Sequence, residues 1–374
     1  MNITILKEKL KEGIDVVGKI TQKTLTLPAL QNTFLKIEKN FLKLSTTNLE
    51  SGISWWGLAK VEKEGEICVP TKFFANLLGF LPNKPVNLQT KDSVLSLECG
   101  NYQTKIKGLS SEDFPIIPQP KEGEVVSLNN HSFCQALSQI SSIPSTSITR
   151  PEISGIFFSF QGDLIKMVAT DSFRLAEKKL FLKTNLSKEH TLILPQNAAK
   201  EIISIFGEKQ GDLKIYLSPN QILLEYPMEE TKHPQIQFTS RLVEGGYPNY
   251  EEIIPKKYDT QVLVEKKEFL NQIKTASLFS GKISEVKVKI NPKDGKIEIS
   301  SQNPDLGEYQ SFFKGKIKGK EVSISFNHRF LIDGISEIKT NELSFELTNE
   351  EGPAALKPLD TKDYLYIIMP IKAS

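Results

Sequence analysis

The chain has 374 residues, 39% of them apolar, and a formal net charge of +2. Such a chain can bury two or three cores of ordinary domain size, and its small charge excludes a strongly basic nucleic-acid binder. No apolar run approaches the length that crosses a bilayer, and the charged first residues lack a signal peptide's apolar core, so we expect a cytoplasmic protein without membrane contact.

Three segments along the chain begin with a short apolar strand and continue into an amphipathic helix. They start near residues 3, 126 and 262. Their first large apolar helix residues are Leu10, Phe133 and Phe269, which lie 123 and then 136 residues apart. Aligning these three brings the following apolar positions of each helix into register, as expected for equivalent faces that cover equivalent sheets.

Two further sets of three occur in the same order. The residues Asn48, Asp171 and Asn303 each follow a strand pattern, as turn-forming residues do, and lie 123 and 132 residues apart. A second helix follows in each case, within 69–81, 194–206 and 326–338. Similar offsets for independent landmarks indicate three tandem copies of one domain.

Strands make up most of each copy. Alternating apolar and polar residues predict hairpins around Lys91–Asp92, Pro219–Asn220 and Asp294–Gly295. This alternation indicates antiparallel sheets with one buried face, and the two helices of each copy should pack on it, which gives an α+β fold. Stretches rich in Pro, Gly and charge predict boundaries that give domains 1–122, 123–255 and 256–374.

Catalytic and metal-binding patterns are missing from the sequence. It contains neither a G-x-G-x-x-G nor a Walker phosphate loop nor a G-x-S-x-G elbow, and its four histidines lie far apart, so we expect no enzyme, no cofactor and no metal. The Asp171, Ser172 and Arg174 group is better explained as a polar turn than as an acid–base cluster. Three widely spaced cysteines in apolar patterns (Cys68, Cys99, Cys134) predict reduced core thiols.

The repeat also predicts an assembly. Three copies in a row leave two sheet edges unpaired, and a second chain can pair with both in a head-to-tail manner and close a ring. The basic residues are mostly lysines, since only Arg150, Arg174, Arg241 and Arg329 are arginines. Lysine acts as a hydrated point charge, so any contact with nucleic acid should be weak and independent of sequence.

The whole chain resembles bacterial sliding clamps, the beta subunits of DNA polymerase III. The matching motifs, in order, are TLPAL (26–30), TTNLE (46–50), VPTKFF (69–74), EDFP (112–115), ATDSFRLA (169–176), GGYPNYEEIIP (245–255), FN (326–327) and YIIMPIKAS (366–374). The resemblance implies a clamp fold, a head-to-tail homodimeric ring around duplex DNA, and partners that dock through short linear peptides. Those partners would be the polymerase III alpha subunit, the clamp loader, and other polymerases and repair proteins.

The resemblance also implies site residues. The partner-peptide pocket would comprise Arg150, Ile153, Thr170, Ser172, Phe173, Arg174, Leu175, Pro248, Ile253, Asn327, Phe330, Ile367, Ile368, Met369, Pro370 and Ile371. Candidates facing DNA are Lys19, Lys23, Lys72, Lys200 and Lys274. For the dimer interface we predict Thr104, Lys105, Ile106 and Lys107 in the first copy, and Leu278 and Phe279 in the third.

Some positions depart from the family or permit a simpler explanation. Family members often have Gly–His in place of Ser172–Phe173, a basic residue in place of Glu252, and Met-Arg-Leu at the end of the chain. By periodicity alone, Ile153, Leu175, Ile253 and Ile368 could be core residues, and the lysines could be ordinary solvated side chains. Two other functions stay open: a scaffold that binds only proteins, and a hydrolase with a site split between copies.

Overall fold

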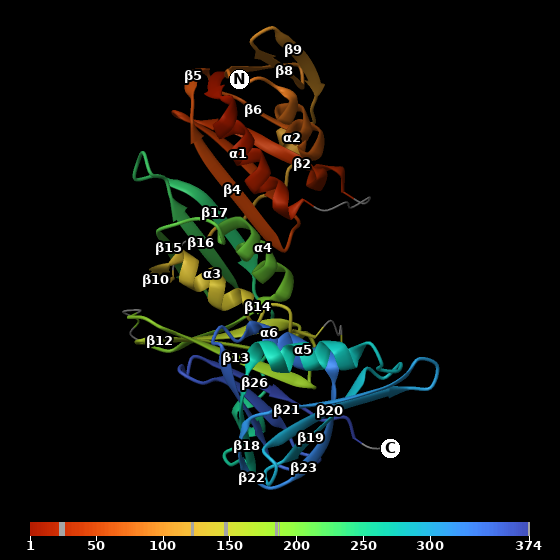
Figure 1. The fold of residues 1–374 in the computed structure, drawn as a ribbon. Coiled ribbons are helices and arrows are strands. Elements are labelled where there is room, and N and C mark those ends of the chain that lie inside the picture. Colours follow the sequence, from red (N-terminus) through yellow and green to blue (C-terminus); the bar gives the residue numbers. More distant parts are fainter. Residues whose placement is uncertain (22–26, 121–122, 146–148, 184–185, 187, 373–374) are drawn as a thin grey trace. The chain divides into compact units, whose positions relative to one another are not determined.

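The computed structural model describes residues 1–21, 27–120, 123–145, 149–183, 186 and 188–372. Its six α-helices fall two to each repeat, as predicted (Figure 1). They are α1 (Lys7–Val17), α2 (Thr71–Phe80), α3 (Asn130–Ser138), α4 (Gln196–Phe206), α5 (Lys266–Ser277) and α6 (His328–Glu337).

The aligned helix positions are equivalent in the structure. Leu10, Phe133 and Phe269 are all buried, as are the residues that follow them on the same faces. In the first repeat α1 lies across β4 and contacts α2, and in the third repeat α5 contacts α6 (Figure 1). The alignment of the three copies is therefore confirmed by burial.

Twenty-six strands form four antiparallel sheets among the described residues. The first sheet has the order β5 (Lys60–Lys63), β1 (Asn2–Leu6), β7 (Pro85–Lys91), β8 (Val94–Cys99) and β9 (Tyr102–Lys107). The second sheet has the order β10 (Glu124–Asn129), β15 (Asp212–Leu217), β16 (Gln221–Pro227), β17 (Pro234–Arg241), β4 (Ser51–Leu58), β3 (Phe41–Thr47), β2 (Asn32–Glu38) and β6 (Glu66–Pro70).

The other two sheets have nine and four strands among the described residues. The third has the order β14 (His190–Pro195), β11 (Gly155–Gln161), β12 (Leu164–Thr170), β13 (Arg174–Phe181), β26 (Tyr364–Ile368), β25 (Ala354–Pro358), β24 (Glu342–Leu347), β18 (Thr260–Glu265) and β22 (Lys316–Gly319). The fourth has the order β21 (Gly307–Lys314), β20 (Lys296–Asn303), β19 (Glu285–Asn291) and β23 (Val322–Asn327).

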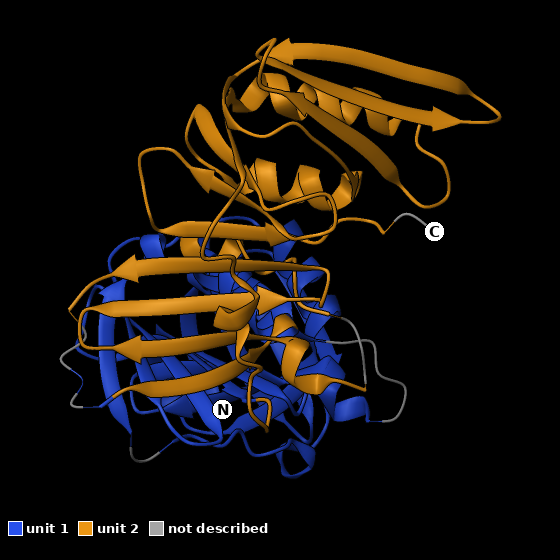
Figure 2. Ribbon diagram, turned by 90° about the horizontal axis from the view of Figure 1, so that it is seen from below, with its two compact units in different colours: residues 1–135, 184–188, 197–242 blue, residues 136–183, 189–196, 243–374 orange. Residues whose placement is uncertain are grey.

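Neighbouring repeats share a sheet. Strand β4 of the first repeat pairs with β17 of the second, and β13 of the second repeat pairs with β26 of the third. The chain accordingly divides into two compact units, residues 1–135, 184–188 and 197–242, and residues 136–183, 189–196 and 243–374, with the second repeat contributing to both (Figure 2). Each of the two sheets that continue from one repeat into the next therefore lies within a single unit.

The turn residues of the three copies also have one role. The side-chain oxygens of Asn48 and Asp171 each accept two backbone N–H groups from the residues two and three positions further on. Asn303 accepts from the Asp305 N–H at 2.9 Å. These side chains stabilise the reversal of the chain before β4, β13 and β21, of which β4 and β13 pair with a strand of the next repeat.

The hairpin predictions are mostly confirmed. Pro219–Asn220 lies in the turn between β15 and β16, and Gly295, with φ +60°, lies in the turn between β19 and β20. The first turn, however, lies one residue later than predicted. Lys91 pairs with Val94, and the turn residues are Asp92 and Ser93, both with positive φ. The expectation of core thiols is confirmed, because all three cysteines are free and buried.

A half-buried carboxyl group contacts the Asn48 turn between β3 and β4. The Asn48 side-chain amide donates to Glu201 of α4 at 3.2 Å. Burial raises the pKa of Glu201, and Glu50 adds to the rise, while hydrogen bonds from Ser51 and Asn48 act against it. At the equivalent position of α6, Asp333 contacts the second turn through Arg174.

The raised pKa of Glu201 predicts how stability depends on pH. The folded chain holds a proton on this carboxyl at pH values where the unfolded chain has lost it, so its contribution lowers stability as pH rises above about 4.5. Glu201→Gln should remove this loss. Compared with the parent, the variant should gain free energy of unfolding between about pH 4.5 and pH 7, measured by denaturant titration. A constant difference across that range would contradict the prediction.

Candidate protein-binding cleft

A cleft of about 530 Å³ opens in the second unit. The turn between β12 and β13, the start of α6 and the last described residues form its walls. Its lining residues are Ser172, Phe173, Ile283, Asn327, Phe330, Met369, Pro370, Ile371 and Lys372. Most of these side chains are apolar and Lys372 carries the one charge among them, so the cleft can bury apolar side chains of a ligand.

Two backbone hydrogen bonds hold the C-terminal segment that forms one wall. The Met369 N–H donates to the Phe173 carbonyl at 2.8 Å, and the Ile371 N–H donates to the Ser325 carbonyl of β23 at 2.8 Å. Strand β26 ends at Ile368, and Pro370 between the two bonded residues has no N–H to continue the ladder. The segment therefore leaves β26 and passes beside the edge of β23.

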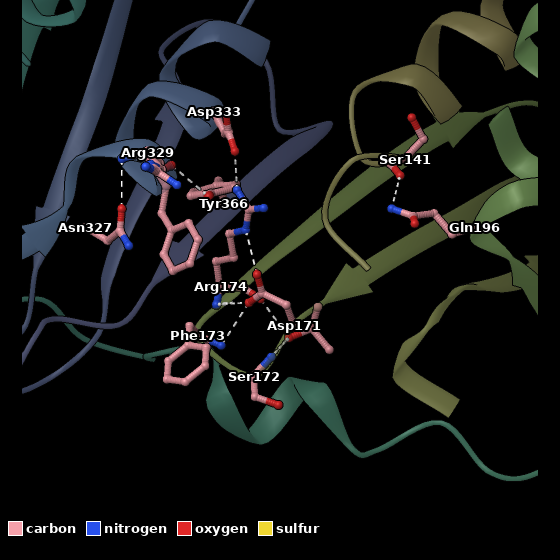
Figure 3. A network of polar contacts seen from close by, with 12 residues as sticks. Ser141, Asp171, Ser172, Phe173, Arg174, Gln196, Asn327, Arg329, Asp333 and Tyr366 are labelled. Carbon is pink, nitrogen blue, oxygen red and sulfur yellow. Dashed lines mark hydrogen bonds and ion pairs between the residues drawn. The ribbon is translucent and has the colours of Figure 1, made fainter. Parts of the chain in front are cut away.

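Arg174 holds the neighbouring turn and helix α6 together (Figure 3). Its guanidinium pairs with Asp171 at 2.9 Å and with Asp333 of α6, and lies over the Phe330 ring at 4.5 Å from the ring centre. The Arg174 side chain is only 10% exposed. Two carboxylates and an aromatic face thus compensate for the burial of this cation, and together they orient the Phe330 side chain.

Tyr366 of β26 completes this network. Its hydroxyl donates to the Phe330 carbonyl at 2.8 Å. A Cβ on Gly334 of α6 would lie 2.5 Å from the Tyr366 ring, so only glycine permits this close packing of α6 on β26. Burial raises the pKa of Tyr366, so its hydroxyl stays protonated as a donor. The pKa of Arg174 is raised although burial acts to lower it, because Tyr366, Asp333 and Asp171 outweigh burial.

Ser172 occupies a strained backbone position at the cleft. Its φ of +78° lies in the left-handed region that favours glycine. The Ser172 N–H donates to the Thr170 hydroxyl at 3.2 Å, and its own hydroxyl accepts from Arg150 at 3.3 Å. These contacts stabilise the turn despite the strain.

The structure divides the predicted pocket residues into several groups. Ser172, Phe173, Asn327, Phe330, Met369, Pro370 and Ile371 line the cleft. Arg150 and Arg174 contact its walls from outside. Asn327 also caps α6, since its side-chain oxygen accepts the Arg329 N–H at 3.0 Å. Sequence reasoning missed Ile283 and Lys372, which lie on connecting segments without a periodic pattern.

Other predicted pocket residues lie elsewhere. Leu175 and Ile367 are buried in an apolar cluster with Tyr250, which lies in the short 3-10 turn Tyr250–Ile253. Thr170, Ile153 and Ile368 are buried. Ile253 is exposed, and Pro248 lines a separate polar hollow. Leu175 and Ile367 are thus covered by residues of the 243–258 segment and do not line the cleft.

The remaining predicted residues lie on the expected elements. Thr104 to Lys107 belong to the edge strand β9, and Leu278 is exposed at the end of α5. The exposed lysines Lys72, Lys200 and Lys274 lie on α2, α4 and α5. Lys19 donates to the Ser204 carbonyl in α4. Lys23 falls outside the described residues.

The described residues offer little else for chemistry. They contain no group of three or more His, Cys, Asp or Glu side chains that is arranged to hold a metal ion. No described helix is both long and apolar enough to cross a membrane.

Tandem domains joined edge to edge define a clamp fold, and comparisons with known proteins identify the family. Three models of the DNA polymerase III beta subunit match the chain, those of the N-terminal domain at residues 1–118, the central domain at 127–249 and the C-terminal domain at 251–372. The chain therefore belongs to the DNA polymerase III beta subunits, the sliding clamps of bacterial replication. It is a non-catalytic processivity factor.

Individual relatives agree with this result. The beta sliding clamp of Staphylococcus aureus is 27% identical, with 100% of this chain and 99% of that protein covered. The sliding clamp structure from Bacillus subtilis has a TM-score of 0.94 at 24% identity. The griselimycin-bound structure from Bartonella birtlesii has a TM-score of 0.92 at 25% identity. Each of the two structures covers 100% of both chains.

The strain at Ser172 gives a prediction for the cleft. A β-branched residue is poorly suited to the left-handed region, so Ser172→Val should lower the free energy of unfolding by about 1–2 kcal/mol. Ser172→Gly, the matched control, should leave it within about 1 kcal/mol of the parent. Denaturant unfolding checks both variants. Equal stabilities of the valine and glycine variants would show that the strain is absent.

Proposed function

We propose that two copies of this chain close head to tail into a ring around duplex DNA and recruit partner proteins through the cleft. Family membership supports a clamp function. The ring is proposed because two edge strands of the chain have no pairing partner on their outer side. Among the described residues, β9 and β21 end their sheets without a further strand, while the equivalent strands β17 and β4 pair with each other.

Exposed apolar side chains support closure at these ends. Phe73 and Phe80 of α2 and Tyr102 of β9 are exposed in the first repeat. Leu278, Leu306 and Phe312 are exposed in the third, and Phe80 and Leu278 are the most exposed of the six, at 84% and 69%. Phe279 stacks on Tyr309 of β21, with ring centres 5.9 Å apart. The predicted Leu278–Phe279 segment therefore lies beside the free edge of β21, where a second copy would cover it.

The internal junctions predict the register of this closure. Thr239 pairs with Gly52 at the first junction, and Ile367 pairs with Leu175 at the second. These pairs are equivalent: following the paired residues from strand to strand, starting at the aligned helices and turns, leads to corresponding positions at the two junctions. Counted in the same way, the equivalent residues at the two free edges are Lys105 of β9 and Glu308 of β21. The proposed ring thus places a lysine of one copy opposite a glutamate of the other, which is a favourable cross-strand pair.

A cysteine pair tests this register. In it Gln103 lies opposite Gln310, and opposed residues of antiparallel strands are close enough for a disulfide. The variant carrying both Gln103→Cys and Gln310→Cys should form covalent dimers under mild oxidation, seen on a non-reducing gel. The native cysteines should not interfere, because all three are buried and burial raises the pKa of Cys68 and Cys134 to about 12.

A shifted pair serves as the control for that experiment. Gln103→Cys with Phe312→Cys places the thiols two residues out of register and should cross-link far less. Equal yields from the two pairs, or a monomer for the parent chain in native mass spectrometry, would refute the proposed junction. Lys105→Glu combined with Leu278→Asp should separately yield monomers.

For the cleft, the proposed ligand is an extended peptide with two large apolar anchors such as Leu and Phe. Phe173, Phe330 and Met369 supply apolar contact for them. Burial of two anchors contributes roughly 3–6 kcal/mol before association entropy is subtracted, so micromolar affinity is expected. Arg150 at the outside of the turn is available to fix a polar peptide residue. Ile153, Leu175, Ile253, Ile367 and Pro248 would contribute if the 243–258 segment moves to admit the peptide.

Removal of the C-terminal wall tests the cleft. A chain without Met369–Ser374 loses the segment bonded to Phe173 and Ser325, so its affinity for a peptide bearing Leu–Phe should fall at least about tenfold. Phe330→Ala should also lower the affinity for the peptide. Phe181→Ala, at an exposed phenylalanine outside the cleft, should leave the affinity unchanged. Fluorescence anisotropy measures affinity, and native mass verifies that the dimer persists. An unchanged affinity of the truncated chain would reject this site.

The partners proposed for the cleft are the alpha subunit of DNA polymerase III, the clamp loader, and other polymerases and repair proteins, acting in the cytoplasm. The supporting observation is the family itself. A protein that only scaffolds other proteins would share the cleft but would not remain on DNA.

Lysines of the helices are the proposed DNA contacts. Replacing Lys72, Lys200 and Lys274 by glutamine should weaken binding to every DNA sequence alike, and should reduce the salt slope by roughly one for each lysine that contacts a phosphate. Replacement of Lys256 and Lys257 in the connecting segment is the control. A strong preference for one DNA sequence, or binding insensitive to salt, would contradict the ring.

A further inference from the structure

The first unit contains a hollow beside the turn that is equivalent to the turn lining the cleft of the second unit. It measures about 250 Å³. Leu49 in the turn between β3 and β4 forms one wall, Ile116 and Ile117 form another, and Ser240 and Arg241 at the end of β17 close it. Leu49 has φ +74°, close to the +78° of Ser172 in the equivalent turn. We call this site the Ile116 hollow.

The apolar side chains of the hollow are exposed for a structural reason. Ile117 packs directly on β4, where a Cβ on Gly52 would lie 2.5 Å from the Ile117 Cγ2 atom. With Ile117 fixed against the strand, its neighbour Ile116 points outward and is 92% exposed, and Leu49 is 47% exposed. Two exposed aliphatic side chains that line one hollow present a binding surface for a third.

Charge decides what kind of ligand fits. The Arg241 backbone is held by a hydrogen bond from its N–H to the Glu50 carbonyl at 2.9 Å. Among the described residues, the exposed Arg241 guanidinium takes part in no ion pair, so it is available to a carboxylate. The lining of the hollow holds one cation, Arg241, and one anion, Glu50, so it suits a single carboxylate placed beside Arg241 and disfavours a polyanion such as a nucleic-acid backbone.

From these observations we infer that the Ile116 hollow is a second peptide-docking site, which takes one aliphatic side chain flanked by an acidic residue. The aliphatic side chain contacts Leu49 and Ile116, and the carboxylate pairs with Arg241. Arg–carboxylate pairing fixes the direction of the peptide. The volume of the hollow, about half that of the cleft, accommodates one anchor where the cleft accommodates two. Binding here is therefore weaker than in the cleft, by at least about tenfold.

The experiment uses the chain without Met369–Ser374, so that the cleft does not contribute. The probes are a fluorescent peptide with Leu next to Asp, and the same peptide with Lys in place of Asp. Anisotropy should show weak binding of the Asp probe and at least about fivefold weaker binding of the Lys probe, as expected for loss of one charge-assisted contact. Arg241→Glu should reverse this preference, a result that a purely structural role of Arg241 does not produce.

Ile116→Asp should abolish binding of the Asp probe. The variant should fold like the parent, because the Ile116 side chain is almost fully exposed. Phe181→Asp, at an exposed phenylalanine of the second unit, is the matched control and should bind like the parent. The inference fails if the truncated chain binds neither probe. It fails also if Ile116→Asp and Arg241→Glu bind both probes as the parent does. Neither result bears on the cleft, because the truncation removes its C-terminal wall before these measurements.

Discussion

Backbone pairing between neighbouring repeats is the constraint on which the rest of this structure depends. A strand at the edge of a sheet carries unpaired N–H and C=O groups, and each repeat satisfies those of one edge with a strand of the next. β4 pairs with β17, and β13 pairs with β26, in the same register. Among the described strands, β9 and β21 each keep one unpaired edge at the two ends of the row of repeats, and one further copy can pair with both.

The same junctions create the surfaces that are available to partners. Each places a turn with a left-handed residue beside the end of a strand from the next repeat. At the second junction Arg174 links this turn to α6 and orients Phe330 at the wall of a large cleft. At the first junction the position of Leu175 is occupied by Gly52, and Ile117 packs into the space. The hollow at the first junction measures about 250 Å³, against about 530 Å³ for the cleft at the second.

Sequence reasoning predicted what depends on periodicity. The three aligned helices, their buried positions and the turn residues Asn48, Asp171 and Asn303 all follow from local patterns, and the structure confirms them. The cleft was predicted less completely. Leu175 and Ile367 are apolar strand residues, and which face of the sheet each occupies depends on the 243–258 segment that packs over them. Ile283 and Lys372 reach the cleft only because the third repeat folds around them, which no local pattern encodes.

Topological linkage to DNA is the central claim, and retention on circular DNA tests it most directly. The chain is loaded onto nicked circular DNA, separated from free protein by gel filtration at high salt, and followed after a restriction enzyme linearises the circle. A closed ring remains with the circle in salt that screens lysine–phosphate contacts, and it slides off once free ends exist. Equal retention on circular and linear DNA, or loss from both at the same salt concentration, would contradict the account.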